Sequence, residues 1–114
     1  MPYMIGGELV EIGSEPRHQD GILWVPLRKL GHALGGNADW VAPNQVAVLY
    51  LRDRIITITI GDKTADIDGE RRELQGAPFV DDGETWVPVR LFESLGYTLS
   101  ADAQNGIVDL TPPA

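Results

Sequence analysis

The segments DGILWVPLR at residues 20–28 and DGETWVPVR at residues 82–90 are two versions of one sequence, separated by 62 positions. Six of the nine positions are identical, and the exchange of Leu27 for Val89 keeps the apolar character. Self-similarity at a fixed offset indicates a duplicated structural unit. The chain should therefore consist of two copies of one structural unit, each built around this segment.

The similarity extends on both sides of the segment. Upstream, IGGE at residues 5–8 matches IDGE at residues 67–70, and downstream Leu34-Gly35 matches Leu95-Gly96 at an offset of 61, which shortens the second helix by one residue. A chain of 114 residues is one domain by the usual size prior. The sequence predicts a single domain over residues 1–114, with repeat one at about 3–51, a connecting strand within 52–64 and repeat two at about 65–111.

Each repeat contains signals for one short helix. Pro26 and Pro88 suit the first turn of a helix, where a missing N–H costs nothing. Gly35 and Gly96 stand where a left-handed residue ends a helix. Helices of about nine residues are unstable in isolation. Packing against strands must therefore hold them in place.

The remaining pattern is that of short strands. Two-residue turns are expected at Gly6-Gly7 and at Asp68-Gly69. Residues 55–60 alternate isoleucine with threonine and should pair with residues 46–51 across a tight turn. The predicted fold class is α+β: a mainly antiparallel sheet of short strands, two short helices against one face, and an internal duplication.

The tryptophans of the repeated segment lie on strands that enter the core. Core packing is the favoured interpretation of Trp24 and Trp86, and an exposed platform for stacking a sugar is the alternative. Trp40 and Tyr50 are candidates for an exposed aromatic surface that binds a glycan or a protein. They are therefore candidate ligand-binding residues.

Composition excludes several classes of function. The net charge of −8 repels phosphate backbones, so nucleic-acid binding is not expected. No cysteine is present, which removes disulfides and thiolate chemistry. No apolar run reaches the roughly 18 residues of a membrane span. Residues 1–7 lack the basic and apolar regions of a signal peptide, and the compartment stays open.

The doubled motif resembles the copper amine oxidase N-terminal-like domain, also called the stalk domain. Three features carry the resemblance: the Asp-Gly strand ending in Trp-Val-Pro-x-Arg, the short helix ending in Leu-Gly, and the strand with Trp40. Trp24 and Trp86 stand where that family more often has leucine or methionine. The resemblance implies an accessory module without copper or quinone chemistry, found on bacterial exported or surface proteins, hence an extracytoplasmic location.

No catalytic or metal-binding constellation is evident. His18, expected in a loop, and His32, expected on a helix, have no third ligand at metal spacing. The acidic pairs Asp81-Asp82 and Asp66/Asp68 lie in turn sequences, where aspartate bonds its own backbone. We therefore expect no enzymatic activity, no metal and no cofactor.

Two arginines are the other candidate ligand-binding residues. Arg28 and Arg90 each follow a proline by two positions at a helix start, where the helix dipole disfavours a cation. The favoured compensation is a carboxylate or backbone carbonyls between the repeats, and the alternative is an anionic ligand. A partner near each guanidinium would separate these interpretations.

Three functions are compatible with the pattern. The leading hypothesis is a non-catalytic accessory module that attaches to a partner protein or a cell-wall polysaccharide. One alternative is a structural spacer or oligomerisation unit, including a homodimer formed through exposed strand edges. The other is a binder of a small anionic ligand at Arg28 and Arg90.

Overall fold

The computed structural model describes residues 3–41, 43–102 and 104–114; the first two residues of the N-terminal segment considered above lie outside this set. These described residues form thirteen short strands, arranged in three sheets, and two short helices. It is an α+β fold with internal duplication, as the sequence predicts. The predicted antiparallel strands are divided among three sheets, because the strands of one repeat alternate among different partners.

The central sheet has the order β10-β11-β4-β3. Its strands are β3 (Arg17–Gln19), β4 (Ile22–Pro26), β10 (Phe79–Asp81) and β11 (Glu84–Pro88). The terminal sheet has the order β12-β13-β1-β2. Its strands are β1 (Tyr3–Ile5), β2 (Glu8–Val10), β12 (Thr98–Asp102) and β13 (Ile107–Thr111).

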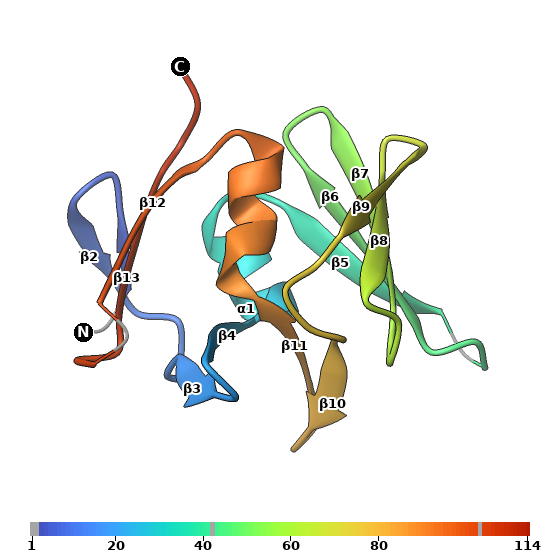
Figure 1. Ribbon diagram of the computed structural model, residues 1–114. Helices are drawn as coiled ribbons and strands as arrows, with labels where there is room; N and C mark the ends of the chain where they lie inside the picture. Colours follow the sequence, from blue (N-terminus) through green and yellow to red (C-terminus); the bar gives the residue numbers. More distant parts are fainter. Residues whose placement is uncertain (1–2, 42, 103) are drawn as a thin grey trace.

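The third sheet has five strands in the order β5-β6-β7-β8-β9. Its strands are β5 (Asn37–Val41), β6 (Val46–Leu51), β7 (Arg54–Thr59), β8 (Thr64–Ile67) and β9 (Glu70–Glu73). The terminal and five-stranded sheets lie on either side of the helices, and the central sheet lies below them in Figure 1.

The two copies of the repeated segment pair directly with each other. Strands β4 and β11 are antiparallel neighbours, and their register places Val25 opposite Val87. These valines are equivalent positions of the repeat, so a local two-fold axis passes between them. Both are fully buried. The same register sets the tryptophan of each strand opposite the proline of the other.

The two tryptophans have matching environments. Trp24 and Trp86 are 4% and 3% exposed. Each indole N–H is directed at a backbone carbonyl five residues earlier, that of Gln19 at 3.1 Å and that of Asp81 at 3.4 Å. The ring of Trp24 also meets Phe79 of the other repeat edge to face, with centroids 4.9 Å apart. The tryptophans thus bind the two repeats together.

The outer hairpins pair across the repeats. In the terminal sheet, β13 of the second repeat lies parallel to β1 of the first. In the five-stranded sheet, β6 corresponds to β13 and β8 corresponds to β1. These two strands do not pair directly, because the connecting strand β7 lies between them. The predicted pairing of residues 55–60 with 46–51 is confirmed by the β6–β7 register, which sets Leu51 opposite Arg54. A lone hairpin is marginally stable, which explains why each finds a partner sheet.

The helices differ from the prediction in detail. Helix α1 (Leu27–Ala33) is α-helical, whereas η1 (Val89–Leu95) is a 3-10 helix of the same length. The second helix is therefore not one residue shorter than the first, as the change of offset had suggested. Both prolines precede the helices: each is the last residue of its strand, with an extended ψ of 120° or 136°.

Both helices end at a left-handed glycine. Gly35 has φ +94° and Gly96 has φ +92°, in the region that only glycine occupies without strain. The helices also pack across the repeats, α1 against β11 and η1 against β4. Each helix is thus held by a strand of the other half, in addition to strands of its own.

Shortening either axial valine should destabilise the whole domain. We expect Val25→Ala and Val87→Ala each to lower the free energy of unfolding by about 2 kcal/mol, because the cavity forms where both repeats meet. Urea denaturation measures this. Val41→Ala, at a side chain 44% exposed, is the matched control and should change stability by less than about 0.5 kcal/mol. Wild-type stability in both axial variants would contradict this account of the core.

Candidate functional site

A groove with a volume of about 340 Å³ lies where α1, the hairpin β5–β6 and the hairpin β10–β11 meet. Helix α1 and β6 belong to the first repeat, and β10–β11 to the second. The groove therefore exists only because the repeats are interleaved. Its lining is Leu27, Arg28, Ala38, Asp39, Trp40, Ala47, Val80, Gly83, Glu84 and Thr85.

Trp40 is the large aromatic side chain of this groove. The β5–β6 register sets Trp40 opposite Ala47, and Ala47 is buried with 4% exposure. The indole therefore points to the inner face of the sheet, yet it is 44% exposed because it lies at the rim. A half-exposed tryptophan on the core side of a sheet edge is available for contact with a ligand.

Tyr50 does not belong to the same surface. It lies opposite Asn37, and side chains alternate between the faces of a strand, so Tyr50 points to the outer face of the sheet. It is also 44% exposed and lies beside Ile55, its partner on β7, which is 50% exposed. The two aromatic residues predicted as ligand-binding thus cannot contact one ligand together.

The two candidate arginines are likewise separated. Arg28 lines the groove, and its Nη2 donates to the carbonyl oxygen of Ala38 at 3.0 Å. Arg90 lies in another depression beside Leu74 and pairs with Glu93 at 2.8 Å. The compensating groups are thus a carbonyl and a carboxylate, but each comes from the same repeat as its arginine and not from the other.

The duplication provides an internal comparison for the groove. Positions that build the core are kept in both repeats, as with Trp24 and Trp86. Trp40, by contrast, corresponds to Ala101 on β12, which occupies the same place in the fold. The fold therefore does not need a tryptophan at position 40.

A second, more polar groove of about 550 Å³ contains a network that sequence reasoning missed. The Ser14 hydroxyl donates to a carboxylate oxygen of Glu84, and the Lys29 ammonium contacts both, at 2.8 Å each. The three residues come from the β2–β3 loop, from α1 and from β11. No local sequence signal joins residues so far apart.

The network sets the ionisation of Glu84. Burial by itself would raise the pKa of this carboxyl, but hydrogen bonds from Lys29 and Ser14, with the charges of Lys29 and Arg17, hold the pKa below its ordinary 4.5. Arg17 also pairs with Asp81 at 2.5 Å and lies over the ring of Trp86, 4.2 Å from its centroid. These contacts tie the β2–β3 loop, through Ser14, and strand β3, through Arg17, to the second repeat.

The histidines and the acidic pairs singled out in the sequence lie on strands, a helix and turns. His18 lies on strand β3, not in a loop, and His32 lies on α1. Asp82 has φ +53° in the turn between β10 and β11. Within residues 3–41, 43–102 and 104–114, no group of three histidine, cysteine, aspartate or glutamate side chains is arranged to hold a metal ion.

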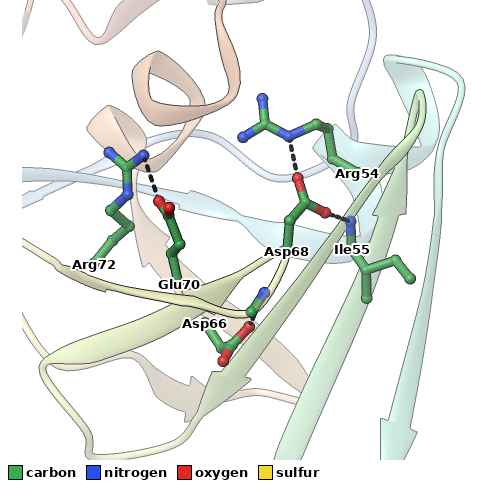
Figure 2. Close-up of polar contacts among 7 residues, drawn as sticks. Arg54, Ile55, Asp66, Asp68, Glu70 and Arg72 are labelled. Carbon is green, nitrogen blue, oxygen red and sulfur yellow. Dashed lines mark hydrogen bonds and ion pairs between the residues drawn. The ribbon is translucent and has the colours of Figure 1, made fainter.

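Asp66 and Asp68 both act on the backbone of their own sheet (Figure 2). Asp66 Oδ1 accepts from the N–H of Gly69 at 2.8 Å, which closes the turn. Asp68 Oδ1 accepts from the N–H of Ile55 at 2.8 Å, and its Oδ2 accepts from Arg54 Nε at 2.5 Å. The Ile55 amide, and then Arg54, lower the pKa of Asp68. The pair stabilises the β7–β8–β9 turns.

The comparison with known families agrees with these features. The chain matches the copper amine oxidase N-terminal domain over residues 4–110, nearly its whole length. It therefore belongs to this family, as the doubled motif indicates. In copper amine oxidases this domain is a non-catalytic, stalk-like part. No curated protein matches the chain. No helix in the described part of the chain is long and apolar enough to cross a bilayer.

Replacing Glu84 should reveal the network through its pH dependence. Glu84→Gln should lower the free energy of unfolding at pH 7 by about 1 kcal/mol. The folded pKa of Glu84 lies below the unfolded one, so its contribution is present above the unfolded value of 4.5 and is lost as pH falls through the folded value. The difference from wild type should therefore shrink below pH 4.5.

Urea denaturation at pH 7, 5, 4 and 3 measures that difference. Glu8→Gln, at an exposed position of β2, removes the same charge outside the network and should have little effect at any pH. A Glu84→Gln deficit that stays constant down to pH 3 would show that Glu84 acts through packing and not through its charge.

Proposed function

We propose that this chain is a non-catalytic attachment module, and that the groove of Trp40 and Arg28 holds its partner, a protein or a cell-wall polysaccharide. The observation that carries the proposal is the half-exposed indole at a position where the other repeat has alanine. Exposed aromatic residues beside charged groups are typical of surfaces that bind proteins or sugars.

The chemistry of the groove supports binding rather than reaction. Glu84 is engaged by Ser14 and Lys29, so its carboxylate is held ionised and is a poor general acid. Lys29 Nζ donates to the Ser14 hydroxyl oxygen and pairs with Glu84, so it is not placed to take a proton from Ser14. The polar groups nearest the groove thus fix the loop to the core. Family membership supports the same conclusion.

The charge of the domain restricts the chemical class of partner that can bind the groove. The chain carries −8, and Arg28 is the single cationic residue among those that line the groove in the described part of the chain. A polyanion would be repelled by the field of the whole domain. A neutral or basic partner with apolar groups matches the apolar side chains of Leu27, Ala47 and Val80.

Self-association is the second candidate function, and one observation favours it. Tyr50 and Ile55 are paired across β6 and β7 and are 44% and 50% exposed on the outer face of the five-stranded sheet. An exposed apolar pair of this kind can join two copies. This face is distinct from the groove, so the two functions are separable by mutation.

Trp40→Ala should weaken attachment strongly, whereas Tyr50→Ala should leave it unchanged. Cosedimentation with bacterial cell walls, before and after protease treatment, tests this and separates a protein partner from a glycan. Loss of a central tryptophan at an interface should weaken binding at least about tenfold. Iodide quenching gives a second readout, because Trp24 and Trp86 are buried and bound material should shield only Trp40.

Tyr50→Ala is matched to Trp40→Ala in exposure and lies on the opposite face of the same sheet. If it reduces the molar mass in light scattering, the outer face joins two copies. Equal binding by wild type and Trp40→Ala would refute the groove as the attachment site.

A further inference from the structure

Strand β5 is one edge strand of the five-stranded sheet, and its sequence differs from that of the other edge strand, β9. Strand β9 has the sequence ERRE, with all four residues exposed. Charged side chains along an edge discourage pairing with another chain. Strand β5 has the sequence NADWV, with one charge, and both Trp40 and Val41 are 44% exposed. Of these two edges, β5 is the one open to a further strand.

One backbone carbonyl of β5 accepts a hydrogen bond from a side chain and not from a neighbouring strand. Arg28 Nη2 donates to the carbonyl oxygen of Ala38, and β6 is the single strand that neighbours β5 among the described residues. A carbonyl accepts two hydrogen bonds, so an incoming strand could still bond here. The groove runs beside this same edge, since Ala38, Asp39 and Trp40 all line it.

We propose that the groove takes an extended polypeptide segment, which adds to the edge of β5 as a sixth strand of the sheet and places a basic side chain beside Asp39. This inference rests on the proposed function, because it names the class of partner that the groove holds. Strand addition obtains affinity from main-chain hydrogen bonds and specificity from alternate side chains.

The alternation of β5 defines the two faces of the added segment. Trp40 points to the inner face, opposite Ala47, so the inward side chains of the partner would be apolar and would enter the groove. Asp39 lies opposite Val48 and points to the outer face. Opposite charges on neighbouring strands attract, so the outward side chains would be basic. The charge of −8 favours the same partner.

A second copy of this chain fits the edge poorly. Antiparallel pairing of β5 with the whole of another β5 would set Asp39 against Asp39. Like charges directly opposite each other are destabilising, and two domains of −8 repel each other as well. A foreign basic segment avoids both costs. A glycan lacks the regular alternation of donors and acceptors along a strand edge.

The test uses a ten-residue peptide of alternating lysine and valine, titrated into the full chain. Nuclear magnetic resonance with amide hydrogen exchange should show slower exchange in β5. Two matched peptides provide controls. One carries glutamate for lysine and should bind at least about tenfold more weakly. The other keeps every lysine but is N-methylated at alternate residues, which removes main-chain hydrogen bonds, and should not protect β5.

Two variants of the chain carry the same change of charge. Asp39→Lys should weaken binding of the lysine peptide about fivefold. Glu73→Lys, on β9 at the other edge of the same sheet, should weaken it by less than about twofold. Equal losses from both variants, or equal binding of the N-methylated peptide, would show general attraction to an acidic domain and would overturn the inference.

The remaining outcomes separate this inference from the proposed function. If the lysine peptide does not bind while protease-treated cell walls still bind in a Trp40-dependent manner, the occupant is a glycan; the strand-addition inference is then wrong and the attachment function stands. If β5 amides are protected in the free chain and the chain is dimeric, the occupant is a second copy, and the inference is wrong as well.

Discussion

The antiparallel pairing of β4 with β11 is the interaction on which the rest of the structure depends. It joins the two copies of the repeated segment at their most buried residues, Val25 and Val87. The helices start directly after these strands, and the flanking strands β3 and β10 supply the carbonyls that accept from the tryptophans. Loss of this pairing would therefore leave each helix without a fixed starting point.

The exchange of hairpins makes the two repeats interdependent. Strand β1 pairs with β13, and β8 and β9 complete the sheet that begins with β5. Neither repeat contains a full sheet of its own, so the core forms only when both are folded. The groove beside Trp40 is a product of this interleaving, because its walls come from both repeats. A groove of this kind cannot exist in a single repeat.

The duplication also separates what the fold requires from what it permits. Tryptophan, valine and proline recur at the pairing of β4 with β11, where a change in one copy would disturb the other. Trp40 and Ala101, at equivalent places on edge strands, are free to differ because neither is needed to close the core. The groove thus lies at edge strands, where the structure tolerates substitutions. The pairing of β4 with β11 that supports it does not tolerate them.

The local sequence determined the order of strands and helices, the left-handed glycines after the helices, the pairing of β7 with β6 and the family. These depend on periodicity and turn chemistry over a few neighbouring residues. Only the tertiary structure decided that the hairpins exchange partners, that Trp40 and Tyr50 point to opposite faces, and that Ser14, Lys29 and Glu84 meet. The physical reason is that strand partners, and the contacts of loops and helices, are set by hydrogen bonding and packing between residues far apart in the chain, which no local pattern encodes.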